Sequence, residues 1–225
     1  MQKKSVTTME EILQPHSHSS KEVNLIVLGS PGVGKSAILV RYLTKRFIGD
    51  YHPLLETVSS HSTVVDDKTV LVHIRDTAWK AIDSQQRENH LSWADGIMIV
   101  YSIMDRESFE SCKKLVDKVL QLCDEATPIS VIGNKADMLH MRQVQFEEGL
   151  AFCRNRNLLF SEVSAGDSYD SVEKAVRTLI QEVRHCRKKK EKSKNSEGGL
   201  KLDIRQSLKN FTEKRLQIRH RTSTL

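Results

Sequence analysis

The chain has 225 residues and a formal net charge of +6 at pH 7; 38% of its residues are hydrophobic and 28% are charged. It has no apolar run near the ~18–20 residues that cross a membrane, and its polar first 22 residues lack the apolar core of a secretory signal. The four cysteines are widely spaced and form no C-x-x-C pair, which argues against a disulfide framework or a zinc site and for a reducing compartment; they are Cys112, Cys123, Cys153 and Cys186.

Basic residues gather towards the C-terminal end of the sequence. Residues 184–225 contain 14 Lys and Arg against 4 Asp and Glu, a net charge of +10, whereas the rest of the chain carries a net charge of −4. We therefore expect any anionic surface or partner to meet this basic tail.

In chain order, residues 1–21 are polar and unpatterned, and we predict a disordered N-terminal extension. Short apolar runs rich in β-branched residues predict buried strands at 23–29, 69–76, 96–103, 128–134 and 158–164. Asp66, Asp67 and Lys68 separate two alternating runs in the sequence STVVDDKTVLVHI, which predicts a β-hairpin. Helical periodicity occurs at 36–45, 107–122, 146–155 and 169–187. This alternation predicts an α/β fold with a mostly parallel sheet, and residues 200–219 of the tail could form an amphipathic helix.

The sequence GSPGVGKS matches the phosphate-binding pattern G-x-x-x-x-G-K-[ST], between a predicted strand and a predicted helix. In that setting backbone N–H groups point at phosphate oxygens, while Lys35 neutralises the β- and γ-phosphates and the Ser36 hydroxyl binds Mg²⁺. The alternative is an ordinary glycine turn. The candidate nucleotide-binding residues of this segment are Gly29, Ser30, Pro31, Gly32, Val33, Gly34, Lys35, Ser36 and Ala37.

A second motif, Asn134-Lys135-Ala136-Asp137, directly follows the predicted strand 128–134. A carboxylate at Asp137 can accept hydrogen bonds from N1–H and the 2-amino group of guanine, and adenine offers neither donor. Ser164 and Ala165 come at the end of the next predicted strand and are further candidates. On its own the motif could be a polar turn; behind a phosphate-binding loop it favours guanine.

With these motifs, residues 22–183 resemble the G domain of Ras-superfamily small GTPases. The resemblance implies a six-stranded, mostly parallel sheet with one antiparallel edge strand, flanked by helices, that binds GTP or GDP with Mg²⁺. It implies that Asp76, in Asp76-Thr77-Ala78, holds the metal together with Ser36, and that Phe47 packs against the guanine; Phe47 could instead be an ordinary loop residue. The segment LTKRFIGDY and the lack of a C-a-a-X box resemble the branch without prenylation.

The chain departs from the family at three places. Leu54 stands where the family has the switch I threonine, and Thr57 could replace that threonine only through a register shift. Trp79 and Lys80 stand where switch II has glycine and the glutamine that orients the attacking water, and lysine has no acceptor for that task. Pro31 removes one N–H donor from the phosphate-binding loop.

Two functions follow from these departures. One is a signalling GTPase with slow hydrolysis, and the other is a scaffold of GTPase fold that hydrolyses negligibly. We assign no catalytic residue. We expect a monomer in the cytoplasm, with a nuclear or peripheral membrane location left open. Its expected partners are guanine nucleotide and effector and regulator proteins, with at most weak contact between the tail and anionic membranes and no nucleic acid.

Overall fold

The computed structural model describes residues 21–47, 58–77, 79 and 82–193. The chain divides into two units, Met1–Arg184 and His185–Leu225, and residues 185–193 of the second unit are helical. The predictions for residues 1–20 and for the tail beyond residue 193 lie outside the described part of the chain. Within that part, no helix combines the length and the hydropathy needed to cross a membrane.

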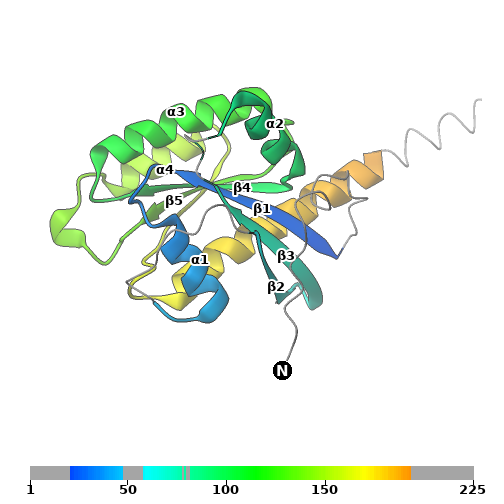
Figure 1. Ribbon diagram of the computed structural model, residues 1–225, viewed down its shortest axis with the longest axis horizontal. Helices are drawn as coiled ribbons and strands as arrows, with labels where there is room; N and C mark the ends of the chain where they lie inside the picture. The colour runs from blue at the N-terminus through cyan, green and yellow to red at the C-terminus, as the bar shows by residue number, and fades with distance from the viewer. Residues whose placement is uncertain (1–20, 48–57, 78, 80–81, 194–225) are drawn as a thin grey trace, which may run out of the picture. The chain divides into compact units, whose positions relative to one another are not determined.

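A six-stranded sheet forms the centre of the first unit (Figure 1). Its strands in spatial order are β2 (Val58–Val65), β3 (Lys68–Asp76), β1 (Glu22–Gly29), β4 (Gly96–Ser102), β5 (Ile129–Asn134) and β6 (Leu159–Glu162). Strand β2 pairs antiparallel with β3, and every other pairing is parallel. The predicted mostly parallel sheet with one antiparallel edge strand is confirmed.

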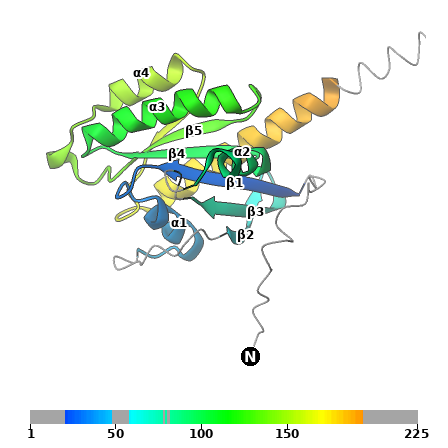
Figure 2. The same ribbon diagram turned by 45° about the horizontal axis from the view of Figure 1, so that its top comes forward.

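Helices cover both faces of the sheet, and in Figure 2 some of them lie above the sheet and others below it. Helix α1 (Lys35–Thr44) and the helix that begins at residue 169 pack on one face. The other face is covered by α2 (Ser84–Trp93), α3 (Arg106–Leu122) and α4 (Phe146–Arg154), with a short 3₁₀ helix at Leu139–Met141 before α4. Because strands β1, β4 and β5 are covered on both faces, their sequences read as continuous apolar runs.

Helix α2 is absent from the sequence prediction. Its sequence SQQRENHLSW is almost wholly polar, and only His90 and Leu91 are buried, so it gives no apolar periodicity. The signal that could have found it is a capping box. The side chain of Asp83 accepts from the Gln86 N–H at 2.7 Å, and the side chain of Gln86 accepts from the Asp83 N–H at 3.1 Å.

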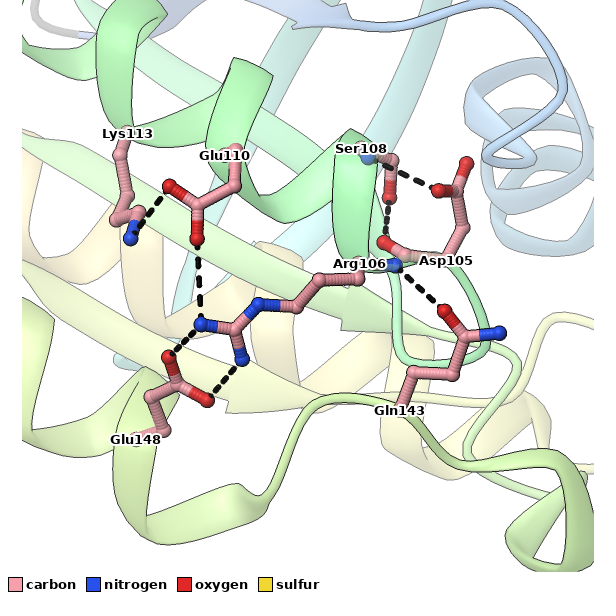
Figure 3. A network of polar contacts seen from close by, with 7 residues as sticks. All are labelled: Asp105, Arg106, Ser108, Glu110, Lys113, Gln143 and Glu148. Carbon is pink, nitrogen blue, oxygen red and sulfur yellow. Dashed lines mark hydrogen bonds and ion pairs between the residues drawn. The ribbon is translucent and has the colours of Figure 1, made fainter.

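Helices α3 and α4 are joined by a polar network at the start of α3 (Figure 3). Arg106 makes two charge-assisted hydrogen bonds to the Glu148 carboxylate, at 2.5 and 2.6 Å, and a 3.2 Å ion pair with Glu110. The backbone N–H of Arg106 also donates to Gln143 Oε1 at 3.1 Å. This network connects the start of α3 to α4 and to the loop that follows β5.

Candidate nucleotide-binding site

The phosphate-binding loop runs from the end of β1 to the start of α1, as the sequence predicts. Gly29, Gly32 and Gly34 have φ values of 146°, 76° and 94°, which L side chains rarely adopt. A Cβ atom at Gly29 would lie 2.3 Å from the Val100 carbonyl oxygen, and one at Gly34 would lie 2.2 Å from Asn134 Nδ2. The loop therefore needs glycine at both ends to pack against β4 and β5.

The N-terminus of helix α1 is suited to bind an anion. Its N-cap is Gly34, and among the described residues no side chain caps its first turn. The free N–H groups of a helix N-terminus and the positive end of its dipole favour a negatively charged group. The start of α1 therefore fits the phosphates of a nucleotide.

Lys35 lies inside this loop. Its Nζ donates to the carbonyl oxygens of Gly29 and Ser30, each at 3.1 Å. Burial lowers the pKa of Lys35, and the nearby Asp76 carboxylate opposes that shift. A partly buried ammonium group held by carbonyl oxygens is a ready partner for phosphate oxygens.

Ser36 and Asp76 form the candidate metal site. Ser36 Oγ, on α1, donates to Asp76 Oδ2, at the end of β3, at 2.5 Å. A hydroxyl and a carboxylate oxygen are ligands that Mg²⁺ accepts, with its remaining positions filled by water or phosphate. The donor atoms at this site therefore fit the metal that the sequence predicts.

Asn134 joins the phosphate-binding loop to the loop after β6. Its Nδ2 donates to the Val33 carbonyl at 2.9 Å, and its Oδ1 accepts from the Ala165 N–H at 3.2 Å. The side chain is buried and links segments about 100 residues apart. It therefore holds the candidate phosphate and base sites in a fixed arrangement.

Asp137 is oriented by the loop after β6. Ser164 Oγ donates to Asp137 Oδ1 at 2.6 Å, and the same Oγ accepts from the Asp167 N–H at 2.9 Å. Lys135, between Asn134 and Asp137, has a φ of 66° that turns the chain at the end of β5. The Asp137 side chain is exposed and can accept from a ligand.

The structure thus brings together the predicted residues of the phosphate loop, Asp76, the segment 134–137 and Ser164 with Ala165. Pro31 is exposed on this loop, and Phe47, just after α1, is 51% exposed and so accessible to a base. Leu54, Thr57, Ala78 and Lys80 lie outside the described residues. Trp79 is described: it is 7% exposed and packs in the core cluster that contains Ile82 and Leu91.

One contact near the base site was missed by the sequence analysis. Arg41 Nη2, on α1, donates to the Gly166 carbonyl at 2.9 Å. The two residues are 125 positions apart and match no local motif, so no sequence signal could have paired them.

The fold is a mostly parallel sheet with helices on both faces. It carries a glycine loop at the end of β1 and oxygen ligands at the ends of β3 and β5. These features together define a P-loop nucleotide-binding protein. A model of the Ras family matches residues 24–185. The chain belongs to the Ras family of small GTPases, which are nucleotide-binding signalling proteins.

Individual relatives align over the same region. Ras-related and estrogen-regulated growth inhibitor of Homo sapiens is 40% identical over 171 residues, which cover 75% of this chain and 84% of that protein. Ras-like protein family member 12 of Danio rerio is 42% identical over 171 residues, which cover 74% of this chain and 66% of that protein. Ras-like protein family member 11A of Mus musculus is 39% identical over 173 residues, which cover 72% of this chain and 71% of that protein.

Proposed function

We propose that this chain binds GTP and GDP together with Mg²⁺ and acts in signalling with slow intrinsic GTP hydrolysis. The observation that carries the proposal is the bridge made by Asn134. Asn134 contacts the loop that precedes Lys35 and Ser36, and it also contacts Ala165, next to the Ser164 that donates to Asp137. A cationic group for phosphate and a carboxylate for the base, linked through Asn134, support a guanine nucleotide as the ligand.

Each of these groups has a separate task in binding. Lys35 and the N–H groups at the start of α1 hold phosphate oxygens, and Ser36 and Asp76 hold the metal. Asp137 accepts from the guanine edge while Ser164 fixes the orientation of its carboxylate. Bound Mg²⁺ would neutralise charge on the β- and γ-phosphates.

Slow hydrolysis is supported by the side chains of switch II. Gln86 takes part in the capping box of α2, and Gln85 Nε2 donates to Asn89 Oδ1 at 3.2 Å, one turn further on. Both glutamines thus make hydrogen bonds within α2 and stand nine and ten residues past Asp76, away from the position of the family's glutamine. Lys80 replaces the residue that does so in the family, and Leu54 replaces the switch I threonine.

A second function, a scaffold that binds nucleotide and hydrolyses negligibly, is favoured by one specific observation. Trp79, where switch II has glycine in the family, is buried in the core instead of lying in a free loop. An anchored residue at this position opposes the closure of switch II on the γ-phosphate. The slow enzyme and the scaffold then differ in rate alone.

The test measures binding and turnover separately. Binding of fluorescent mant-GDP is competed with GDP and with ADP in Mg²⁺; we expect GDP to displace it and ADP to fail. A single-turnover assay with [γ-³²P]GTP, with an EDTA-treated sample as control, then gives the hydrolysis rate. Equal displacement by ADP and GDP would contradict the guanine assignment, and release of phosphate no faster than in the EDTA control would favour the scaffold.

A further inference from the structure

The C-terminal end of α1 contacts the segment that follows β6. Arg41 Nη2 donates to the Gly166 carbonyl at 2.9 Å, and Lys45 Nζ lies 5.4 Å from the centre of the Tyr169 ring, within range of a cation–π contact. We call residues 164–169 the base loop. Two basic side chains, Arg41 on α1 and Lys45 at its C-cap, therefore contact the base loop at Gly166 and at Tyr169.

The part of the base loop that Arg41 holds adjoins the candidate guanine acceptor. A Cβ atom built on Gly166 would lie 3.8 Å from Ser164 Oγ and 3.9 Å from Asp137 Oδ2. Ser164 is the residue that orients Asp137, and the Ser168 N–H closes the loop on the Ser164 carbonyl at 3.0 Å. A shift of the Gly166 peptide would therefore displace Ser164 and change the orientation of the Asp137 carboxylate.

The same turn of α1 also sets the path to Phe47. Lys45 is the C-cap of α1, with a φ of 60°, and its N–H donates to the Arg41 carbonyl at 2.9 Å. Phe47 follows two residues later. Basic groups at this helix end are also favoured by the negative end of the helix dipole.

We propose that Arg41 and Lys45 are positioning residues that hold the base loop against α1 and thereby slow the release of guanine nucleotide. The inference rests on the proposed function, since it concerns the affinity of the same site. Two tethers from outside the loop reduce the number of conformations available to it, so less order is lost when the base binds. Neither residue is part of the predicted nucleotide-binding set.

The test compares nucleotide release from full-length variants loaded with mant-GDP and chased with excess GDP. Arg41→Met removes every side-chain donor while keeping much of the side-chain length, and Arg41→Lys keeps the positive charge and an ammonium group that can donate. Arg154→Met is the matched control, because Arg154 is exposed on α4. We expect release from Arg41→Met to be about tenfold faster than from the control, with Arg41→Lys in between.

A readout specific to the base separates positioning from general destabilisation. Inosine diphosphate lacks the 2-amino group that Asp137 would bind, so a displaced base loop should lower the preference for GDP over inosine diphosphate. We expect this preference to fall in Arg41→Met and to stay unchanged in Arg154→Met. Release rates of Arg41→Met and Arg154→Met within twofold of each other, or an unchanged preference, would overturn the inference. If the unmodified chain failed to bind mant-GDP, the proposed function itself would be wrong and the inference would fall with it.

Discussion

Arg87 holds Trp79 in two ways. Its Nε donates to the Trp79 carbonyl oxygen at 3.1 Å, and its guanidinium carbon lies 5.6 Å from the centre of the Trp79 ring. The indole is buried in the cluster beneath α2, with Ile82 and Leu91. A position that is a flexible glycine in the family is therefore part of the hydrophobic core in this chain.

The first prediction concerns stability. Trp79→Gly should lower the free energy of unfolding by about 3 kcal/mol, because it removes a large buried side chain and leaves a cavity. Trp79→Phe keeps an aromatic ring and should cost clearly less. Urea unfolding monitored by circular dichroism measures both variants. A loss below about 1 kcal/mol for Trp79→Gly would mean that the ring is less well packed than its 7% exposure indicates.

The second prediction concerns hydrolysis. Lys80→Gln alone should raise the single-turnover rate of GTP hydrolysis by less than about tenfold, which corresponds to ~1.4 kcal/mol of barrier, because Leu54 and Trp79 remain. An EDTA-treated sample gives the background rate. A rise of a hundredfold or more from this one substitution would show that the lysine is the sole obstacle to catalysis.

The third prediction concerns base recognition. Asp137→Asn replaces a charged acceptor by an amide, and hydrogen bonds to charged groups contribute about 1.5–3 kcal/mol. The affinity for GDP should therefore fall by tenfold or more while the Ser164 contact can persist. Equilibrium titration with mant-GDP measures the change. Asp67→Asn, in the turn between β2 and β3, is the control, and equal affinities of the two variants would contradict the role of Asp137.

Sequence predicted the parts of the site in which the chemistry is local. Eight consecutive residues specify the candidate phosphate loop, and the segment 134–137 contains the candidate base acceptor, because each lies within one strand-to-loop transition. The core strands could also be predicted from the sequence, because a strand that is buried on both faces appears as a run of apolar residues. In these cases the physical requirement and the sequence signal coincide.

The remaining features depend on contacts between distant segments. Arg41 and Gly166 meet only because α1 and the base loop lie side by side in the fold, and Arg142 meets Glu162 across 20 residues. Helix α2 is polar and is specified mainly by its capping box, which periodicity does not detect. The hydrogen-bond and ion-pair partners of exposed or charged side chains leave no periodic pattern in the sequence, so only the structure identifies them.

The fourth prediction compares two ion pairs of different burial. Arg142 and Glu162 form two 2.7 Å hydrogen bonds with side chains only 14% and 10% exposed, and the Glu162 carboxylate raises the pKa of Arg142. Arg142→Met should destabilise the protein by about 2–3 kcal/mol, because it leaves a largely buried carboxylate without its partner.

Arg106→Met, in the network of Figure 3, provides the matched control for this substitution. Arg106 and Glu148 are 47% and 36% exposed, so solvent and salt screen their interaction. We expect a much smaller loss, which should shrink further at 1 M salt. Equal losses for Arg106→Met and Arg142→Met in urea unfolding would contradict the assignment of different roles to the two pairs.

The final prediction concerns the basic residues 184–225, whose net charge of +10 contrasts with the −4 of the rest of the chain. Basic residues near an anionic membrane surface gain about 1 kcal/mol each, so several together can support reversible binding without a lipid anchor. We expect the protein to sediment partly with vesicles containing phosphatidylserine at low salt. We expect it to stay in solution at high salt or with uncharged vesicles.

Substitution of Lys201, Arg205 and Lys209 by glutamine should reduce the bound fraction, whereas the same change at Lys114 and Lys118 on α3 should leave it unchanged. Binding that is insensitive to lipid charge and to salt would show that the tail does not act through electrostatic attraction.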